Sequence, residues 1–462
     1  MNLTPEQKHI IALSQKLRTS EILAIQACAG SGKTTTLREI AMANPNAKFL
    51  YLAFNKAIVR ESNKKFPKNV EVRTIHSIAF AYARKMIGDF RPVSKLNRFD
   101  LEEIIEFENN KMASDIIKLF DEFLKSDKTL EDSLPNKAVI AYLYESALEQ
   151  KIPITHNFYL KFYQLSKDKH LDYDFVLLDE AQDSNAAMIS VFLDNDCKKI
   201  LVGDSFQNIY GFNDSINAFE VIKAHYYATL SQSFRCTQNI LDYANFLLKK
   251  FSNKPFTNMT SNHLIDSDEN SIESKAFITR TNAGIIKLIY TLENSQDFCL
   301  LKEPNKIFAP IWAILHFRNA KFNMIPREYT HLKRIKNNKA LYAYIANSND
   351  LELQGALKLL EYDIDLVEIM HLANKLYNNK KAQNFILNAH QAKGLEWDSV
   401  EICDDFPNLL ALQKRAKDSP EMQKILEQEL HLFYVTITRA KRELVDNSPN
   451  IALLQNKNIN NF

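Results

Sequence analysis

An eight-residue segment near the N-terminus has the composition of a loop that binds phosphate. Residues 27–34 read Ala-Cys-Ala-Gly-Ser-Gly-Lys-Thr, follow an apolar run and open a helical pattern. Backbone N–H groups of such a loop, together with the N-terminus of the helix, can surround phosphate oxygens. Lys33 would reach the β- and γ-phosphates of a nucleotide, and the hydroxyl of Thr34 would bind Mg²⁺.

The residues expected to contact the nucleotide form one continuous set. Ala27 stands where this type of loop usually has its first glycine. Cys28 is expected to pack as a small residue, because the sequence places no His or Asp to activate it. Glycine is scarce, at 8 of 462 residues, so the two here should occupy positions that reject a side chain. The set is Ala27, Cys28, Ala29, Gly30, Ser31, Gly32, Lys33, Thr34 and Thr35.

Two adjacent carboxylates follow a second apolar run. Residues 175–178 read Phe-Val-Leu-Leu, and Asp179 and Glu180 come directly after them. A buried strand that ends in two acids can offer one carboxylate to a metal and the other to an attacking water. We therefore expect Asp179 to bind Mg²⁺ and Glu180 to act as the general base. The alternative is a solvated strand end.

The composition excludes several classes of protein. The chain is 46% hydrophobic and 25% charged, which is typical of a globular chain of two to four domains. A net charge of +2 gives no overall basic field, so nucleic-acid binding must be argued from local motifs. Five scattered cysteines exclude a zinc ribbon, an iron–sulfur cluster and a disulfide scaffold, and they favour the cytoplasm. No apolar run reaches about 18 residues, so no membrane span is expected.

Short apolar runs predict two parallel sheets, each interrupted by an insertion. Such runs are typical of strands that are buried on both faces. They lie at 22–25, 49–52, 175–178 and 200–202, and again at 276–278, 385–387 and 400–402. Residues 83–165 carry Leu101, Ile104, Ile105, Ile116, Ile117 and Phe120 at helical spacing, which predicts a helical insertion.

The expected fold class is therefore α/β, with two domains. The first comprises residues 1–82 and 166–228, interrupted by 83–165. The second comprises 229–293 and 381–462, interrupted by 294–380, a segment rich in aromatic, Lys and Asn residues without a clear period.

The ordered motifs of the chain resemble the UvrD/Rep-like branch of the superfamily-one helicases. The phosphate loop is followed by AFNKA at 53–57, TIHS at 74–77, DEAQD at 179–183, GDSFQNIYGF at 203–212, SFRCT at 233–237, AHQAKGLEW at 389–397 and YVTITRA at 434–440. ITHNFYL at 154–160 and the GLEW ending are most similar to the F-box-helicase-like group, although no F-box is apparent. The resemblance implies two RecA-like motor domains of the P-loop NTPase type.

The resemblance also implies roles for residues around the nucleotide. Gln207 would sense the γ-phosphate, Arg235 and Arg439 would clamp it, Phe234 would stack on adenine, and Glu396 would contact the ribose. A planar, permanently charged guanidinium suits a phosphate clamp. The alternatives are surface ion pairs for the arginines and buried packing for Phe234.

Gln7 has two competing interpretations. In the family the equivalent glutamine reads adenine, and we favour this role. Thr4, Pro5 and Gln7 also match the start of a helix with a capping box.

Aromatic and polar side chains in the motifs predict a track for single-stranded DNA, because stacking on an aromatic ring tolerates any base. The candidates are Phe54, Asn55, His76, Tyr210, Phe212, His390 and Lys393. The sequence departs from the family at Thr35, where Arg is common, at Phe212–Asn213, where Trp–Arg is common, and in the adjacency of Phe54 and Asn55.

The sequence therefore predicts an ATP- and Mg²⁺-dependent translocase and helicase with 3′→5′ polarity, acting on single-stranded and tailed duplex DNA in repair or recombination. Three alternatives remain: removal of proteins from DNA, an ATP-gated DNA-binding module that does not unwind, and a helicase subunit that works with a separate nuclease. A recombinase or a nuclease is the kind of protein partner that the resemblance suggests.

Overall fold

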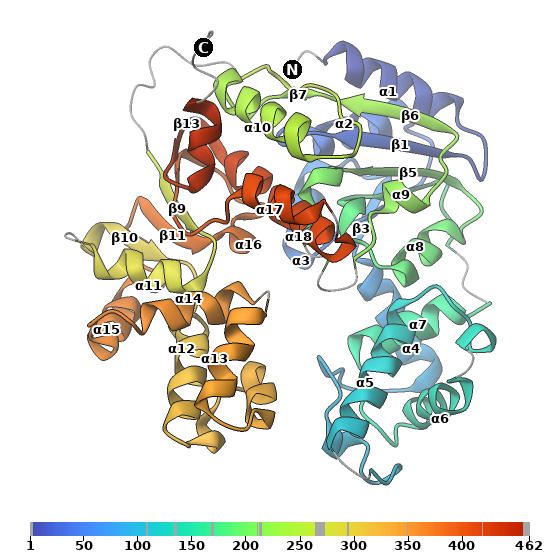
Figure 1. Cartoon of the computed structure of the whole chain (residues 1–462). Helices are drawn as coiled ribbons and strands as arrows, with labels where there is room; N and C mark the ends of the chain where they lie inside the picture. The colour runs from blue at the N-terminus through green and yellow to red at the C-terminus, as the bar shows by residue number, and fades with distance from the viewer. Residues whose placement is uncertain are drawn as a thin grey trace. The chain divides into compact units, whose positions relative to one another are not determined.

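The computed structural model describes residues 3–107, 110–133, 136–167, 171–209, 211, 215–263, 273–292, 295–348, 350–417 and 419–455. The chain divides into two compact units, Met1–Ser231 and Gln232–Phe462 (Figure 1). Each unit has one main sheet whose described strands all pair in parallel. The predicted α/β class with two parallel sheets is confirmed.

The sheet of the first unit has the strand order β3-β2-β4-β5-β1-β6. Its strands are β1 (Ile22–Ala27), β2 (Phe49–Leu52), β3 (Val70–Arg73), β4 (Phe175–Leu178), β5 (Lys198–Gly203) and β6 (Tyr226–Leu230). Its helices are α1 (Pro5–Lys16), α2 (Lys33–Ala43), α3 (Lys56–Lys65), α4 (Ile75–Ile87), α5 (Asn110–Lys125), α6 (Lys137–Leu148), α7 (His156–Leu165), α8 (Ala186–Leu193) and α9 (Ala218–Val221).

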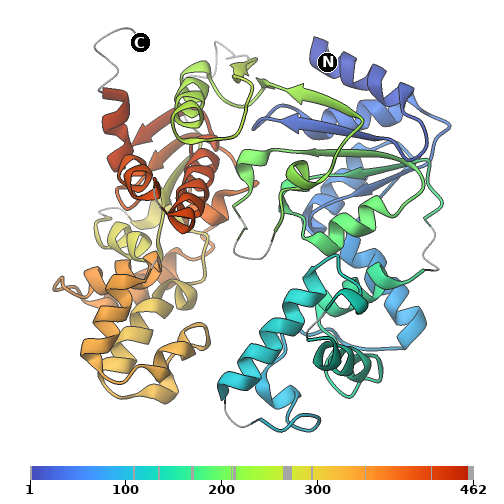
Figure 2. The same ribbon diagram turned by 45° about the vertical axis from the view of Figure 1, so that its right-hand side comes forward.

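Alternate residues of these strands face two separate apolar cores. In β2, Leu50 and Leu52 belong to a core shared with α4 to α8, whereas Phe49 and Tyr51 belong to a core shared with α1 and α2. α1 packs against α2 and β6, as Figure 2 also shows. Both faces of the sheet are therefore covered, which is what a parallel sheet requires. Because both faces of the sheet are covered, polar side chains that bind a ligand are expected at the ends of the strands.

The helical insertion differs in detail from the expectation. The predicted boundary at residue 83 lies inside α4, and α4 packs against α7 (Figure 1). The expected helix through Leu101 and Ile105 is not formed: Arg98–Asp100 is a short 3₁₀ helix, and α5 begins only at Asn110. Asn97 and Asp100 cap this short helix with their side chains. Such local side-chain bonds compete with the α-helix.

The main sheet of the second unit has the order β10-β11-β9-β12-β13. Its strands are β9 (Lys275–Thr279), β10 (Phe298–Leu300), β11 (Asn384–Asn388), β12 (Trp397–Ile402) and β13 (Ala440–Asp446), and β7 (Gln232–Ser233) pairs with β8 (Thr260–Ser261). Its helices are α10 (Gln238–Phe251), α11 (Asn282–Tyr290), α12 (Pro304–Arg318), α13 (Asn338–Asn347), α14 (Leu351–Leu359), α15 (Leu366–Leu376), α16 (Ala389–Ala392), α17 (Leu409–Ala416), α18 (Pro420–Ile437) and α19 (Ala452–Gln455).

The segment that showed no clear period in the sequence, 294–380, is mainly helical. It contains α12 to α15, whose apolar residues share one core with α11, including Phe308, Leu341, Leu353 and Ile369. These helices are short, and 3₁₀ segments at Phe322–Met324 and Arg327–Arg334 separate α12 from α13. The interruptions conceal the helical period in the sequence.

Gly203 at the end of β5 packs closely against the segment that follows β4, and a substitution of this glycine tests that packing. A Cβ atom there would lie 2.2 Å from Oε1 of Gln182 and 3.1 Å from the backbone nitrogen of Ala181. We expect Gly203→Ala to lower the free energy of unfolding by about 1–3 kcal/mol, because a backbone neighbour cannot move aside. Thermal unfolding measures this, and a midpoint at or above the wild-type value would contradict the close packing.

Candidate functional site

The predicted phosphate loop connects β1 to α2 and owes its shape to two glycines. Gly30 and Gly32 have φ values of 69° and 76°, a region in which a side chain is strained. The N–H of Cys28 donates to the carbonyl of Leu230 at 2.9 Å, which attaches the loop to β6. Cys28 is buried, as a packing residue would be. The scarce glycines of this loop therefore stand where the backbone requires them.

Several groups in the loop are suited to an anionic ligand. Gly32 caps α2 without a side-chain hydrogen bond, so side chains do not satisfy the first N–H groups of the helix. Ser31 is buried, and its hydroxyl has no hydrogen-bond partner among the described residues. Thr34 and Thr35 in the first turn of α2 are partly exposed. Nucleotide phosphates fit this donor set.

Lys33 and Glu180 form an ion pair beside the loop. Nζ of Lys33 lies 2.9 Å from Oε1 of Glu180, and Nε2 of Gln182 donates to the other carboxylate oxygen at 2.5 Å. Burial alone would lower the pKa of Lys33, but the carboxylates of Glu180, Asp179 and Asp204 raise it above its usual value. Glu180 has a φ of 49°, which is strained for a residue with a side chain. The structure thus brings together two predicted catalytic residues that are 147 positions apart.

Asp179 is buried next to this pair. Its Oδ1 accepts from the N–H of Glu180 at 2.9 Å, and its Oδ2 accepts from the hydroxyl of Tyr51. Burial and the neighbouring charge of Glu180 raise the pKa of Asp179. Among the described residues, no three His, Cys, Asp or Glu side chains gather to hold a metal. A site with few protein ligands is what Mg²⁺ uses when it also binds phosphate oxygens, and Asp179 and Thr34 suit that role.

Gln207 lies at the end of a third neighbouring strand. It ends the 3₁₀ helix Ser205–Gln207 after β5, where its Nε2 donates to Oδ2 of Asp204 at 2.8 Å. The N–H of Asp204 in turn donates to Oε1 of Gln182 at 3.1 Å. Gln207 is therefore held by side chains from the same edge of the sheet, and its sensing role stays a prediction.

Gln7 performs the capping role that competed with adenine contact. Its Oε1 accepts from the N–H of Thr4 at 3.0 Å, and its Nε2 donates to the hydroxyl of Thr36 in α2 at 3.1 Å. The capping box is complete, and both ends of the side-chain amide are used. Our preference for the adenine role is not supported by this arrangement, since an adenine contact would require these bonds to be exchanged.

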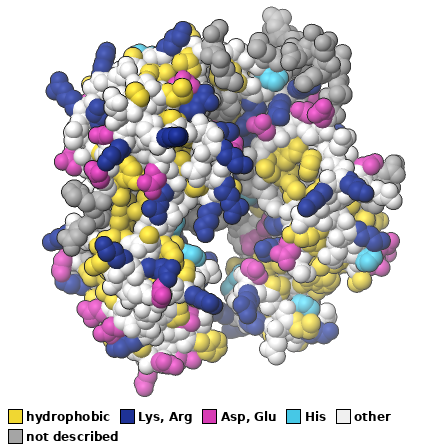
Figure 3. All heavy atoms as spheres, turned by 180° about the vertical axis from the view of Figure 1, so that it is seen from behind, with side chains coloured by type: hydrophobic (Ala, Val, Ile, Leu, Met, Phe, Trp, Pro, Cys, Tyr) yellow, Lys and Arg dark blue, Asp and Glu magenta, His cyan; other side chains and the backbone are white. Residues whose placement is uncertain are grey.

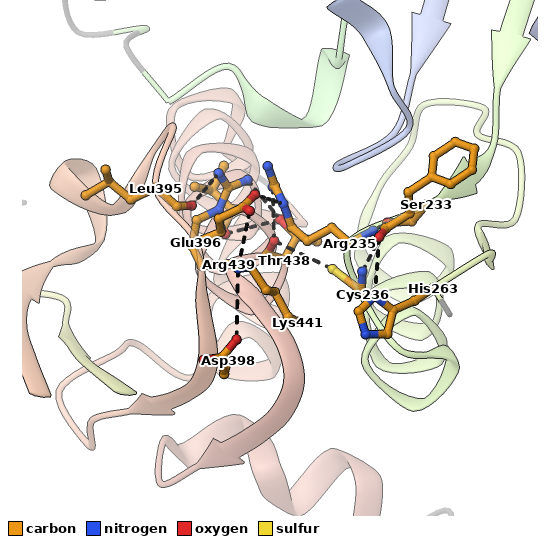
Figure 4. Close-up of polar contacts among 12 residues, drawn as sticks. Ser233, Arg235, Cys236, His263, Leu395, Glu396, Asp398, Thr438, Arg439 and Lys441 are labelled. Carbon is orange, nitrogen blue, oxygen red and sulfur yellow. Dashed lines mark hydrogen bonds and ion pairs between the residues drawn. The ribbon is translucent and has the colours of Figure 1, made fainter. Parts of the chain in front are cut away.

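In the second unit, Arg235 pairs with Glu396 (Figure 4). Nε of Arg235 lies 2.7 Å from Oε2 of Glu396, and Nζ of Lys441 lies 3.5 Å from Oε1. Burial would raise the pKa of Glu396, but the charges of Arg235 and Lys441 lower it. The ring of Phe234 is 40% exposed, so it has a face available for stacking. Glu396, the expected ribose contact, thus holds the expected phosphate clamp.

Arg439 differs from Arg235 in its environment. It is only 2% exposed, and its guanidinium donates to the carbonyls of Val435 at 2.9 Å and Leu395 at 3.2 Å and to the hydroxyl of Thr438 at 3.3 Å (Figure 4). These contacts connect α18 to the segment that precedes β12. All three contacts lie within its own unit, and the role of Arg439 as a phosphate clamp stays a prediction.

The predicted DNA-contacting residues have varied surroundings. Phe54 is 41% exposed, whereas Asn55 caps α3 by accepting from the N–H of Ile58 at 3.0 Å. Burial and the neighbouring His156 lower the pKa of His76 to about 4, and burial with Arg280 and Lys302 lowers that of His390 to about 4. Both imidazoles are therefore neutral at pH 7. His390 lies in α16 and Lys393 ends that helix, while Tyr210 and Phe212 lie outside the described residues.

Three side chains that hold the candidate residues were not among the residues predicted from the sequence. Tyr51 contacts Asp179, Gln182 contacts Glu180, and Lys441 contacts Glu396. One signal was available for Tyr51, because a tyrosine inside a buried apolar strand needs a partner for its hydroxyl. Nothing in the spacing of Lys441 distinguished it from a surface lysine. The face shown in Figure 3 carries Lys and Arg as well as Asp and Glu side chains.

Two family models match separate parts of the chain. Residues 7–213 match the family described as AAA domain, a nucleotide-binding class, and residues 326–446 match the UvrD-like helicase C-terminal domain. These matches are consistent with the UvrD/Rep-like superfamily-one helicases that the ordered motifs resemble. Across the described residues, no helix combines the length and the apolar character needed to cross a bilayer.

Its relatives include F-box DNA helicases. The chain is 28% identical to F-box DNA helicase 1 of Gallus gallus, with 96% of this chain and 49% of that protein covered. It is 29% identical to F-box DNA helicase protein 1 of Schizosaccharomyces pombe, with 96% and 57% covered. A probable DNA helicase of Mycoplasma pneumoniae is 24% identical, with 90% and 78% covered. The chain thus spans about half the length of the two F-box helicases.

The contrast between the two arginines can be measured. We expect Arg439→Met to lower the free energy of unfolding by about 2–3 kcal/mol, because buried carbonyls of Val435 and Leu395 lose their donor. Arg235→Met is the matched control and should cost less than about 1 kcal/mol, since its partner Glu396 is well exposed. Urea unfolding measures both, and equal losses would contradict the structural role of Arg439.

Proposed function

We propose that the chain is an ATP-driven translocase and helicase that moves along single-stranded DNA with 3′→5′ polarity. The observation that carries this proposal is the Lys33–Glu180 pair, which lies beside the loop with two left-handed glycines. The hydroxyl of Ser31, which has no partner in the part of the chain that the structure describes, also suits phosphate. The likeness to UvrD-like helicases supports a motor, whereas polarity and a role in repair or recombination are carried over from the resemblance.

Residues of the first unit bind the nucleotide and Mg²⁺ in this proposal. Loop residues 27–35 hold the phosphates, and Thr34 and Asp179 hold the metal. When bound, Mg²⁺ neutralises charge on the β- and γ-phosphates. Lys33 exchanges its carboxylate partner for phosphate oxygens, because it carries three donors on a flexible side chain. Gln207 donates to the γ-phosphate.

Glu180 then takes the proton of the attacking water. Release of Lys33 leaves the Glu180 carboxylate with the amide of Gln182, which orients it and does not compete for its proton. The strained backbone of Glu180 supports this role, since strain at one residue of a tightly bonded segment is typical of functional positions.

Arg235 supplies positive charge to the γ-phosphate in this proposal. Its pair with Glu396 is accessible and can be exchanged, because the Glu396 side chain is 44% exposed. Glu396 then becomes available for the ribose, and the exposed ring of Phe234 for adenine. The packing of Arg439 supports a positioning role, in which its bond to Leu395 fixes the residue next to Glu396. A direct phosphate contact by Arg439 has less support.

DNA binding is proposed for the exposed ring of Phe54 and for the other motif residues, with Tyr210 and Phe212 stacking on bases. A tailed duplex is the expected unwinding substrate, and a recombinase or a nuclease is a proposed protein partner.

The test is the rate of ATP hydrolysis with no nucleic acid, with single-stranded DNA and with single-stranded RNA, followed by strand displacement on duplexes with a 3′ or a 5′ tail. Stimulation by DNA and displacement only with a 3′ tail are expected. Hydrolysis that does not respond to DNA would contradict the proposal.

Glu180→Gln should separate nucleotide binding from hydrolysis. The amide keeps the shape of the side chain but cannot take a proton, so we expect retained ATP affinity and a rate at least about 100-fold lower. Glu401→Gln is the matched control, because it removes a carboxylate that pairs with Lys275 in the second unit, and it should hydrolyse ATP at the wild-type rate. An equal loss of ATP affinity and hydrolysis in Glu180→Gln would identify Glu180 as a structural or metal-binding residue.

Phe212→Ala tests the predicted DNA track. Loss of one stacking ring should weaken binding of a single-stranded oligonucleotide by about 1–3 kcal/mol, as measured by fluorescence anisotropy. Lys249→Ala, at the end of α10, should bind as the wild type does. If Phe212→Ala instead unfolds at a lower temperature without a change in DNA affinity, Phe212 is a packing residue.

A further inference from the structure

Tyr51 places a hydroxyl group inside the buried edge of the candidate site. It belongs to β2, is completely buried, and packs its ring against Phe66 with centroids 4.8 Å apart. The hydroxyl donates to Oδ2 of Asp179, and Ser62 of α3 is its other hydrogen-bonding neighbour. The phenol is thus held by packing on its ring and by two hydrogen-bonding neighbours of its oxygen.

The register of the sheet explains why Tyr51 meets Asp179. β2 and β4 pair in parallel, with Tyr51 opposite Leu177 and Leu52 opposite Leu178. The N–H of Asp179 continues this ladder by donating to the carbonyl of Leu52 at 3.1 Å. Asp179 is therefore attached to β2 by its backbone and by its side chain.

Both oxygens of the Asp179 carboxylate have a donor from the protein. Oδ1 accepts from the N–H of Glu180 and Oδ2 from Tyr51, which together fix the plane of the carboxylate. A carboxylate offers about four lone-pair sites, so each oxygen can still accept a metal or a metal-bound water. Partners of this kind orient metal ligands, and their loss typically weakens metal binding about 10–100-fold.

We propose that Tyr51 is a positioning residue that orients the Asp179 carboxylate for Mg²⁺ and thereby sets the affinity of the site for the metal. This inference rests on the proposed function, in which Asp179 binds Mg²⁺. The residue acts through Asp179, because its side chain is buried and its hydroxyl is engaged by Asp179 and Ser62.

The test is the dissociation constant for Mn²⁺, a spectroscopic substitute for Mg²⁺, in the full chain saturated with ADP. Electron paramagnetic resonance measures free Mn²⁺ directly and does not depend on hydrolysis. Tyr51→Phe keeps the ring and removes the hydroxyl, and we expect the constant to rise about 10-fold or more. In ATPase assays the half-saturating Mg²⁺ concentration should rise in the same way, with kcat recovered at high Mg²⁺.

Tyr243→Phe is the matched control. Tyr243 is also buried, and its hydroxyl donates to Oδ2 of Asp446 at 2.7 Å in the second unit. This variant loses a comparable buried Tyr–Asp bond and should bind Mn²⁺ as the wild type does. An equal rise in both variants would show a general loss of stability and would overturn the proposal.

The remaining outcomes separate this inference from the proposed function. A wild-type constant in Tyr51→Phe overturns the role of Tyr51 and leaves the ATPase assignment intact. Failure of the wild-type chain to bind Mn²⁺ with ADP overturns the metal assignment itself, and the positioning role with it. If Tyr51→Phe does not fold, Ser62→Ala leaves the tyrosine in place and removes its second partner. We then expect a two- to three-fold rise in the constant, and no rise overturns the proposal.

Discussion

The ion pair between Lys33 and Glu180 is the interaction on which the candidate site depends. Lys33 begins α2 after β1, and Glu180 follows β4, with β5 between the two strands in the sheet. Because the strands are parallel, their carboxyl ends share one edge, and the chain must turn sharply there to direct both side chains to one point. The sharp turns place Gly30, Gly32 and Glu180 at positive φ values, which are strained for Glu180. The pair keeps two partly buried charges compensated, and in the proposed function phosphate replaces Glu180 as the partner of Lys33.

The second unit holds its charged residues by two different means. Arg235 is paired with one carboxylate whose side chain is 44% exposed, and it makes a longer bond of 3.4 Å to the carbonyl of Thr438. Arg439 is bound to backbone carbonyls inside the unit, and such bonds are broken only by disrupting the packing. The resemblance gives both arginines the same role, but their surroundings in the structure differ. Side-chain environment, rather than residue type, separates a residue that can move to a ligand from one that supports the backbone.

The sequence was sufficient for the parallel sheets, for the glycine-bearing loop between β1 and α2 and for the acids at the end of β4. These features depend on local patterns: buried apolar runs, rare glycines and acids at strand ends. It was insufficient where the hydrogen-bond partner of a side chain is distant in the sequence. Gln7 caps α1 because Thr36 of another helix takes its free amide group, and Tyr51 meets Asp179 only through the register of β2 and β4. The turn at Leu101 and the helices α12 to α15 were missed because caps and 3₁₀ segments interrupt the helical period.

The role of Lys33 is tested most directly by the rate of ATP hydrolysis of Lys33→Ala, compared with that of the wild-type chain in the presence of single-stranded DNA. We expect hydrolysis to be abolished, because the β- and γ-phosphates lose the positive charge of Lys33. Glu180 also loses the ion pair that it makes with Lys33 before ATP binds. Circular dichroism should show that the variant is folded. Hydrolysis within severalfold of the wild-type rate would contradict the assignment of the loop and, with it, the proposed motor.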